Sequence, residues 1–410
     1  MTADPAASLL RQRDFLRFWF ARVAAMVGHQ MLAVGVGWQI YALTGSALDL
    51  GFIGLAQFVP AFALVLVAGH AADRFDRRRV LQICVLAEGC AVGALALGSY
   101  QGWITVKAIF ALVFLVGVAR AFQMPAMSAL LPSLVPRALF PRAIASNSAA
   151  TQSAVIAGPA IGGLIYVAGP AAVYATSVAL FLVSGLLVQL IRLERKPPRS
   201  ERVGLDSVLA GIRFIRGRPV VLGAISLDLF AVLLGGASAL LPIFARDILE
   251  TGPWGLGALR SSTAVGGLAM AVYLARHPLR AHAGKLMFAS VAVFGLGTIA
   301  FGLSRWFPLS FVALMILGAA DMVSVVVRQS LVQLQTPDEM RGRVSAVNAL
   351  FIGTSNQLGE FESGVTAAWF GTVPSVVIGG FGTLLVVALW MRLFPSLVAV
   401  DRLDAPAKRE

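Results

Sequence analysis

The sequence predicts an all-α membrane protein with twelve transmembrane helices arranged as two six-helix halves. Of the 410 residues, 58% are hydrophobic and only 13% are charged, whereas about 25% of residues are charged in an average soluble domain. The apolar residues come in runs of about 20, the length of a helix that crosses a bilayer. The 41 glycines agree with this class, because glycine is more frequent in membrane helices than in soluble ones.

The same observations exclude other classes of protein. Outer-membrane barrels alternate apolar and polar residues instead of placing apolar residues in long runs. Cys84 and Cys90 belong to one apolar run, and roughly 9 Å along a helix axis is too far for a disulfide. No small-residue cleavage site follows the first apolar run, which is also too long for a signal peptide, so we expect a mature helix there.

In the first half, glycine, proline and charged residues separate six predicted helices. Gly45 follows the first apolar run, the charged segment 73–79 separates the second from the third, and Pro170 precedes the sixth. The predicted helices span 15–43, 48–72, 79–99, 105–126, 139–166 and 171–192.

The second half follows the same rule. Pro219 precedes the seventh apolar run, Pro253 precedes the eighth, and the basic segment 276–285 separates the eighth from the ninth. The predicted helices span 219–246, 253–276, 285–304, 308–334, 341–370 and 374–394.

The distribution of positive charge predicts the orientation of these helices. The chain has 33 Lys and Arg and a formal net charge of +13. With both termini inside, the external loops contain Lys107, Arg246 and Arg305, and the cytoplasmic segments contain most of the rest. This asymmetry obeys the positive-inside rule and favours contact with anionic lipids. We therefore expect a multi-pass protein of the inner (cytoplasmic) membrane with cytoplasmic termini, and no nucleic-acid partner.

The polar stretches divide the chain into four parts. Residues 1–191 form an N-terminal six-helix half, 219–395 a C-terminal six-helix half, and 396–410 a cytoplasmic tail. Residues 192–218 form a cytoplasmic linker with eight Arg and Lys. Within the linker, one face of a predicted amphipathic, interfacial helix collects the apolar residues, which are Val203, Leu205, Val208, Leu209, Ile212 and Ile215.

An internal repeat relates the two halves. Residues 110–163 align without a gap with the residues 201 positions later, and ten of the 54 positions are identical. The identical pairs include Gly117 with Gly318, Pro136 with Pro337, Arg142 with Arg343, Asn147 with Asn348, and Gly158 with Gly359. Parallel repeats of this kind place a binding cavity at their interface near the bilayer midplane and transport by alternating access.

The segment between the second and third predicted helices resembles the loop signature of the major facilitator superfamily. It reads Gly-x-x-x-Asp-Arg-x-Asp-Arg-Arg-Arg from position 69, with Asp76 where the signature has its second glycine. The resemblance implies a twelve-helix transporter with a cytoplasmic gate, in which a small residue lets helices approach and an aspartate pairs with arginines. The implied gate residues are Gly69, Asp73, Arg74, Asp76, Arg77 and Arg78, with Arg341 and Arg343 from the second half. The alternative interpretation is a basic run that only sets topology.

A second motif lies in the fifth predicted helix. Gly158-Pro159-x-x-Gly162-Gly163 resembles the core of the motif found in the superfamily's antiporters. Proline and glycines make a helix bendable and closely packed. Packing alone is the alternative interpretation of these small residues.

Two further runs, 117–132 and 336–348, resemble the branch of the superfamily that contains the enterobactin exporter and the macrolide and drug efflux proteins. This resemblance implies proton-coupled export of amphipathic small molecules, such as drugs or a siderophore, by a monomer that needs no cofactor besides the proton gradient. A lipid or lysophospholipid transporter on the same fold is one alternative. A membrane-embedded interaction or sensor protein without transport is another.

The sequence does not predict an enzyme. It contains no Gly-x-x-x-x-Gly-Lys-Ser/Thr loop, no His-Glu-x-x-His motif and no nucleophile elbow. The four histidines and two cysteines also form no metal-binding pattern.

Ionisable residues inside the predicted spans are functional candidates, because charge in lipid is costly. A low-dielectric environment favours the protonated form of a carboxyl group, and histidine titrates near neutral pH. The candidates for proton coupling are Asp228, which we rank first, Glu360, Glu362, Glu88 and His29. A structural polar contact is the alternative role for Glu88 and His29.

The repeat singles out one further pair of charges. Arg120 and Asp321 lie 201 positions apart and have opposite charge. We expect them to pair, or to share a polar cavity floor, with a permanent structural pair as the alternative. The candidates for the substrate cavity, selected by helix position, are Arg120, Asp321, Gln30, Trp38, Gln57, Phe58 and Phe230.

Overall fold

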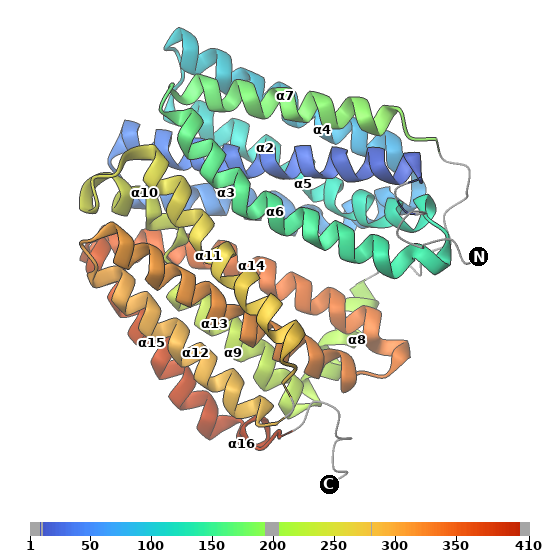
Figure 1. The fold of residues 1–410 in the computed structure, drawn as a ribbon, viewed down its shortest axis with the longest axis vertical. Helices are drawn as coiled ribbons and strands as arrows, with labels where there is room; N and C mark the ends of the chain where they lie inside the picture. Colours follow the sequence, from blue (N-terminus) through green and yellow to red (C-terminus); the bar gives the residue numbers. More distant parts are fainter. Residues whose placement is uncertain (1–8, 10, 193–204, 280, 402–410) are drawn as a thin grey trace. The chain divides into compact units, whose positions relative to one another are not determined.

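A computed structural model describes residues 9, 11–192, 205–279 and 281–401, and these residues fold into helices without any strand (Figure 1). Eleven of the described helices are long and apolar enough to cross a membrane. The remaining predicted span is α14 (Asp338–Phe370), which is 33 residues long but more polar than the others. The predicted all-helical membrane fold is confirmed.

Most of the described helices follow one another with short connections. The first half contains α2 (Arg13–Thr44), α3 (Ala47–Arg74), α4 (Arg77–Gln101), α5 (Val106–Leu134), the single turn η1 (Arg137–Leu139), α6 (Phe140–Tyr166) and α7 (Pro170–Gln189). The second half contains α8 (Leu205–Arg216), α9 (Pro219–Gly235), η2 (Ser238–Leu240), α10 (Leu241–Ile243), η3 (Phe244–Ile248), α11 (Gly252–Arg276), α12 (Ala283–Leu303), α13 (Phe307–Leu334), α14, α15 (Thr372–Leu393) and α16 (Pro395–Val398).

Local chemistry explains many of the helix ends. Gly45 follows α2 in the left-handed conformation with φ 61°, and its amide donates to Tyr41, the usual role of a C-terminal glycine. The Thr105 hydroxyl accepts a hydrogen bond from the amide of Ala108 and so caps α5. Pro170 and Pro219 occupy first positions of helices, where proline removes no needed hydrogen bond.

Helix α5 is longer than predicted. The sequence predicts an end near residue 126, but the helix continues to Leu134 and accommodates Pro125 and Pro132 in its interior. Each proline removes a single backbone donor. Leu130 and Leu131 are buried, so apolar packing continues past the prolines and holds the additional turns.

The seventh predicted span is interrupted, which the sequence analysis did not predict. Helix α9 ends at Gly235, and Gly236 is extended with ψ 92° before the chain resumes as η2, α10 and the π-helical η3. Broken helices are tolerated at membrane depth only where the released backbone groups find partners. Here the Ser363 hydroxyl of α14 donates to the Gly236 carbonyl at 2.6 Å.

The described helices form two compact units, which we call unit 1 and unit 2. Unit 1 contains residues 1–45, 56–202 and 252–261, and unit 2 contains 46–55, 203–251 and 262–410. The units differ from the predicted halves at two segments, since 46–55 of α3 belongs to unit 2 and 252–261 of α11 belongs to unit 1. Helices α3 and α11 therefore contribute to both units.

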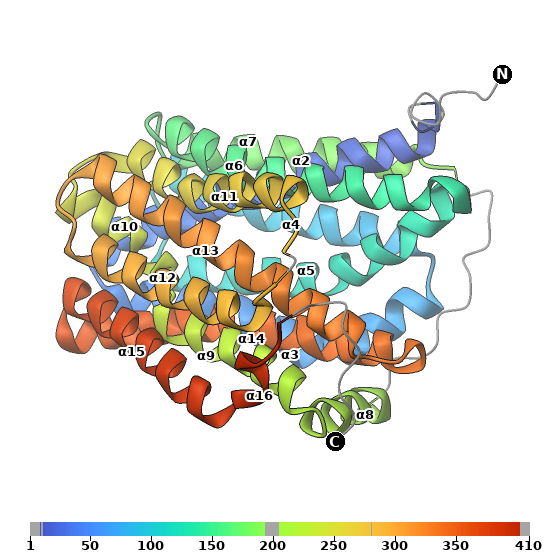
Figure 2. The ribbon, with the colours of Figure 1, turned by 60° about the horizontal axis from the view of Figure 1, so that its bottom comes forward.

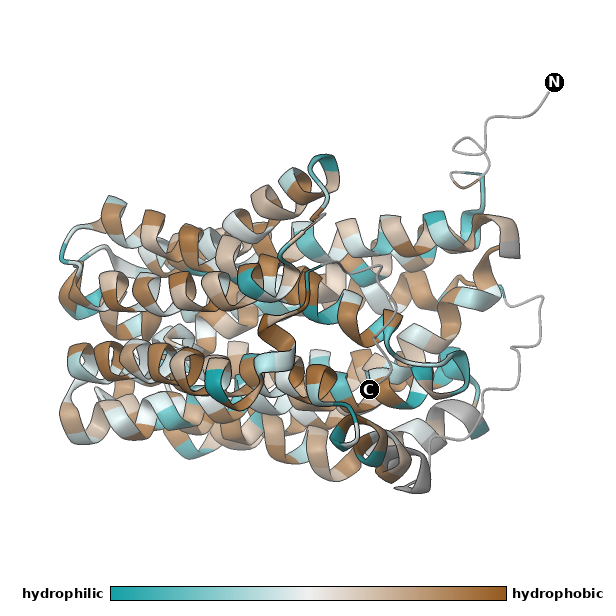
Figure 3. Cartoon of the chain, turned by 90° about the horizontal axis from the view of Figure 1, so that it is seen from below, coloured by the Kyte–Doolittle hydropathy of each residue, from teal (hydrophilic) through white to brown (hydrophobic). Residues whose placement is uncertain are grey.

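Each unit has its own packing. In unit 1, α4 packs against α5 and α7, and α2 packs against α6 and α7. In unit 2, α12 packs against α13 and α15, while α14 and α15 pack against α9 (Figure 2). Apolar residues dominate the length of the helices, and hydrophilic residues concentrate in the connecting segments and helix ends (Figure 3).

Glycines permit matching close approaches in the two units. In unit 1, a Cβ on Gly163 of α6 would lie 3.0 Å from the Cα of Gly257 of α11. In unit 2, a Cβ on Gly364 of α14 would lie 2.7 Å from the Cα of Gly51 of α3. Gly163 and Gly364 lie 201 positions apart, so the repeat in the sequence corresponds to a repeat in helix packing.

The predicted amphipathic helix is α8, and part of its apolar face packs against α14. Ile215 is buried in a cluster with Val344 and Val347 of α14. A Cβ on Gly211 would lie 2.9 Å from the carbonyl oxygen of Arg343. Part of this face therefore packs inside unit 2 while Leu209 remains exposed, and the expected interfacial location stays a prediction. Val203 lies outside the described residues.

The segment after α15 packs against the start of α12. The amide of Ala283 donates to the carbonyl of Asp401, and the amide of Gly284 donates to the carbonyl of Val400. These bonds satisfy amides of the first helical turn, which have no partner inside the helix. Residues 396–401 of the predicted tail are thus part of unit 2.

Candidate functional site

Unit 2 contains a polar cavity of about 210 Å³ between membrane-spanning helices. Its walls come from α9, α11, α12, α13 and α14 and from the segment after the end of α9. The polar residues that line it are Asp228, Ser238, Thr263, Asp321, Arg328, Ser355 and Asn356. Intramembrane cavities with ionisable residues are functional candidates.

An ion pair holds one wall of this cavity together. The Arg328 guanidinium of α13 lies 3.1 Å from a carboxylate oxygen of Asp228 of α9. The two residues are only 2% and 5% exposed. Arg328 also donates to the side-chain oxygen of Asn348 of α14 at 3.4 Å. A buried charge is tolerated when it is paired and hydrogen-bonded, so Arg328 connects three helices.

A second carboxyl group gives the cavity an uneven set of charges. Asp321 lies two helical turns before Arg328 on α13 and lines the same cavity. Asp228 and Asp321 therefore share one guanidinium. With both carboxylates ionised, one negative charge is uncompensated in a low-dielectric environment, whereas one bound proton makes the set neutral.

Part of this site is predictable from the sequence. Asp228 was a candidate for proton coupling and Asp321 for the cavity, and the structure brings both to one pocket. Arg328 is not predictable as the partner of Asp228. The available signal was an arginine inside an apolar run, but choosing its partner requires knowing which faces of α9 and α13 meet.

Arg120 lies in unit 1 and donates to the side-chain oxygen of Gln57 at 3.4 Å. Both were candidates for the substrate cavity, and the structure places them together. A pair between Arg120 and Asp321 would join residues of different units, and it stays a prediction.

Two acidic candidates lie on α14 in unit 2. Glu360 accepts a hydrogen bond from the Ser238 hydroxyl at 3.4 Å, next to the interruption after α9. A Cβ on Gly54 of α3 would lie 3.0 Å from the Cβ of Glu360, so this glycine makes room for the glutamate. Glu362 lies two residues further along and is half-buried.

The aromatic candidates for the substrate cavity lie in different surroundings. Trp38 packs against Tyr166 with ring centroids 6.2 Å apart, beside a buried cluster of unit 1. Phe58 packs against Phe62 of its own helix. Phe230 packs against Trp390 of α15 at 5.1 Å. Trp38 therefore has a packing role in unit 1.

The antiporter-like motif is a close-packing surface on α6. All four of its residues are buried. A Cβ on Gly158 would lie 2.5 Å from the Cβ of Gln30, and one on Gly162 would lie 2.9 Å from the Cα of Met31. The Pro159 carbonyl lies against Gly257. The motif residues thus pack α6 against α2 and against the first part of α11, all within unit 1.

The basic motif after α3 forms hydrogen bonds with neighbouring helices and helix ends in unit 1. The Asp76 carboxylate accepts from the amide of Arg78 at 2.9 Å and caps α4. Arg77 donates to the Ala129 carbonyl of α5, and Arg78 donates to the Ile191 carbonyl after α7, each at 2.8 Å. The aspartate that departs from the signature therefore acts as an N-cap, a role that the sequence analysis missed.

The remaining gate residues are less constrained. A Cβ on Gly69 would meet no described atom within 4 Å, so the close approach expected there is absent in this conformation. Arg74 is exposed, and the side chain of Asp73 lies outside the described part of the chain. Arg341 pairs with Asp338 one turn earlier at 2.7 Å, and Arg343 donates to the sulfur of Met340.

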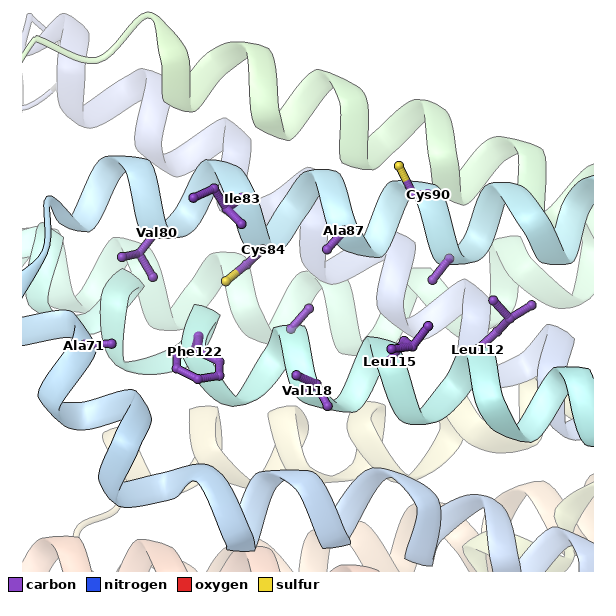
Figure 4. Close-up of a pocket in the computed structure, with 12 residues that line it drawn as sticks. Ala71, Val80, Ile83, Cys84, Ala87, Cys90, Leu112, Leu115, Val118 and Phe122 are labelled. Carbon is purple, nitrogen blue, oxygen red and sulfur yellow. The ribbon is translucent and has the colours of Figure 1, made fainter.

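Unit 1 contains a second cavity of a different kind. It measures about 660 Å³ and is lined by apolar and cysteine side chains of α3, α4 and α5, which are Ala71, Val80, Ile83, Cys84, Ala87, Cys90, Ala91, Leu112, Leu115, Val118, Ala119 and Phe122 (Figure 4). None of these lining residues binds or releases a proton at neutral pH. Its chemistry suits an alkyl chain and not a charged ligand.

With this geometry established, comparisons with known proteins identify the family. Residues 5–409 match the family described as transmembrane secretion effectors. The chain belongs to this family, within the major facilitator superfamily. Its members are membrane transporters and not enzymes, so the resemblance deduced from the motifs is confirmed.

Individual relatives agree with the superfamily assignment. The enterobactin exporter EntS of Escherichia coli is 27% identical over 395 residues, which cover 95% of this chain and 94% of the relative. Among solved structures, a bacterial homologue of the human lysosomal transporter Spinster has a TM-score of 0.75 at 14% identity and covers 96% of this chain and 99% of its own. The nucleoside transporter NupG has a TM-score of 0.72 at 13% identity, with 93% and 99% covered. The structural likenesses show the superfamily fold.

Proposed function

We propose that this superfamily transporter exports amphipathic small molecules, of the siderophore or drug class, across the inner membrane in exchange for protons. The proposed direction and substrate class are supported by similarity to an enterobactin exporter over 95% of the chain. The membership of a family of secretion effectors agrees with outward transport.

The observation that carries proton coupling is the charge set of the polar cavity in unit 2. Asp228 is paired with Arg328 at 3.1 Å, so its negative charge is compensated. Asp321 lines the same cavity, and within the described part of unit 2 the Arg328 guanidinium is paired with Asp228 and not with Asp321. We therefore assign the exchanged proton to the Asp321 carboxyl group. Asp228 stays paired with Arg328. This changes the ranking from the sequence, which placed Asp228 first.

The proposed cycle is alternating access powered by the proton gradient, without a bound cofactor. The matching glycine contacts of α6 with α11 and of α3 with α14 support it, because repeated helices that pack in the same way can exchange contacts in the same way. We propose that the termini are cytoplasmic, that the basic segments contact anionic lipids, and that the transporter works as a monomer.

Transport into inside-out vesicles tests this function. Vesicles with the chain inserted would be given cationic dyes, macrolides and catecholate siderophores under an imposed proton gradient, acidic inside. We expect accumulation of at least one class that stops when a protonophore collapses the gradient. Accumulation that persists without the gradient would contradict proton coupling. Vesicles that contain the Asp321→Asn variant serve as the matched control.

A lipid or lysophospholipid transporter is the second candidate function. The observation that favours it is the apolar cavity of unit 1, whose lining in Figure 4 suits an acyl chain. Substrate-dependent proton movement with lysophospholipids, and none with siderophores or drugs, would favour this function over the first.

A further inference from the structure

A buried acid–base pair connects α2 and α4 in unit 1. The Nε2 atom of His29 lies 3.1 Å from a carboxylate oxygen of Glu88. The Glu88 side chain has no exposed surface, and that of His29 is 11% exposed. The His29 ring packs edge-on against Phe181 of α7, with centroids 4.9 Å apart. The pair is therefore enclosed by protein, and it reaches accessible surface through the histidine.

The hydrogen bonds of His29 fix the tautomer of its ring. Its Nδ1 atom lies 2.6 Å from the carbonyl oxygen of Ala25. A carbonyl oxygen can only accept, so Nδ1 must carry a hydrogen. In the neutral ring, Nε2 is then a bare acceptor that faces a carboxylate oxygen, also an acceptor. Two acceptors at 3.1 Å repel each other, so this contact needs one proton, located either on Nε2 or on Glu88.

The described groups around the pair place no other hydrogen in the contact between His29 and Glu88. The other carboxylate oxygen of Glu88 accepts from the Gln123 amide of α5 at 3.1 Å. Arg120 of α5 and Cys84 of α4 interact with Glu88 electrostatically, and Arg120 directs its hydrogen bond to Gln57. Helix α7 presents the uncharged Phe181. His29 is thus the group that shares the proton with the Glu88 carboxyl group.

We propose that His29 and Glu88 together bind one exchangeable proton, and so form a second proton site in addition to the Asp321 cavity. Removal of this proton would leave a lone pair facing a buried carboxylate, and the contact between α2 and α4 would be lost. The ring has little freedom to turn away, because it packs edge-on against Phe181 and its Nδ1 atom is bonded to the Ala25 carbonyl. Release of the proton would therefore move α2 relative to α4. The part that this site takes in transport rests on the proposed function; the binding of the proton does not.

Nitrogen-15 NMR of histidine tests the proton site without any substrate. The protein would carry labelled histidine and the substitutions His70→Gln, His277→Gln and His282→Gln, so that His29 gives the only signal. We expect Nδ1 to carry hydrogen throughout the range of about pH 5 to 8 in which an unperturbed histidine titrates, while the Nε2 signal changes with pH. In Glu88→Gln we expect a neutral ring with the same Nδ1–H tautomer, because the glutamine amide can donate to Nε2 and still accept from Gln123.

Two NMR results would overturn the proposal. One is a ring with bare Nδ1, and the other is an Nε2 titration that is the same in Glu88→Gln as in the parent. A transport measurement then separates this site from the proposed function. We expect Glu88→Gln to change the pH profile of substrate-driven proton movement, whereas absence of proton movement in the parent would contradict coupled export and leave the NMR result standing. An unchanged pH profile in Glu88→Gln would overturn proton exchange at this pair.

Discussion

One guanidinium determines the character of the polar cavity in unit 2. Arg328 is almost fully buried and contacts Asp228 and Asn348. Because two carboxyl groups share this one positive charge, the cavity is suited to take up and release a proton. Without Arg328, both carboxyl groups would favour the neutral form, and the difference between Asp228 and Asp321 would disappear.

Replacement of Arg328 tests the buried pair. We expect Arg328→Met to destabilise the protein by about 3–5 kcal/mol, because it leaves Asp228 unpaired in the interior. We expect the double variant Asp228→Leu with Arg328→Met to recover most of the loss. The measurement is the stability of the purified protein in detergent toward denaturant.

An exposed pair in the same unit supplies the control for this experiment. Arg341 pairs with Asp338 while both side chains are at least half exposed. Arg341→Met should therefore cost about 0–1 kcal/mol. Equal losses for Arg328→Met and Arg341→Met would contradict the importance of the buried pair.

At the residue scale, the sequence predicts which ionisable groups matter but not how they pair. Asp228, Asp321, His29 and Glu88 were all selected because charge is costly in lipid. Their partners lie on other helices, 59 residues away for His29 and Glu88. Such contacts depend on the rotation of each helix, and a one-residue error turns a side chain by about 100°.

Among the elements, the interruption after α9 shows what apolar runs cannot predict. The sequence predicts one span over 219–246, whereas the helix stops at Gly235. A tertiary contact stabilises the break, because Ser363 of α14 binds the carbonyl that the break releases. Helix ends at Gly45 and Pro170 were predictable because glycine and proline act locally.

Removal of the Ser363 hydroxyl tests this explanation of the break. We expect Ser363→Ala to destabilise the protein by about 1–3 kcal/mol, because the Gly236 carbonyl loses its partner. Ser290→Ala is the control, since the buried Ser290 hydroxyl donates to Met287 of its own helix. A loss for Ser363→Ala no greater than the loss for Ser290→Ala would show that the bond does not stabilise the break.

Close packing of α14 on α3 gives a second prediction at this scale. We expect Gly364→Val to reduce the transport rate by about five- to 150-fold, because overpacking the conformation in which α14 touches α3 costs about 1–3 kcal/mol and each 1.4 kcal/mol is about a factor of ten. Gly353→Val on the same helix should have little effect, because a Cβ there meets no described atom within 4 Å. The rate would be measured in vesicles at equal amounts of inserted protein. Equal rates for the two variants would contradict a role for this contact.

For the whole molecule, the repeat explains both what was predictable and what was not. The offset of 201 residues relates Gly163 to Gly364, and both lie at close helix contacts. It also relates Arg120 to Asp321, yet their described surroundings differ, because Gln57 contacts the first and the second lines a cavity with Arg328. The repeat therefore predicts shared backbone packing, whereas the charged residues distinguish the halves.

In the proposed mechanism, Asp321 carries the exchanged proton while Asp228 stays paired with Arg328. The most direct test is substrate-driven proton movement in proteoliposomes that contain the parent protein, Asp321→Asn or Asp338→Asn, where Asp338 is an exposed aspartate at the start of α14. We predict that Asp321→Asn abolishes proton movement but still lets substrate exchange down its own gradient, and that Asp338→Asn behaves like the parent. Undiminished proton movement in Asp321→Asn would contradict the claim.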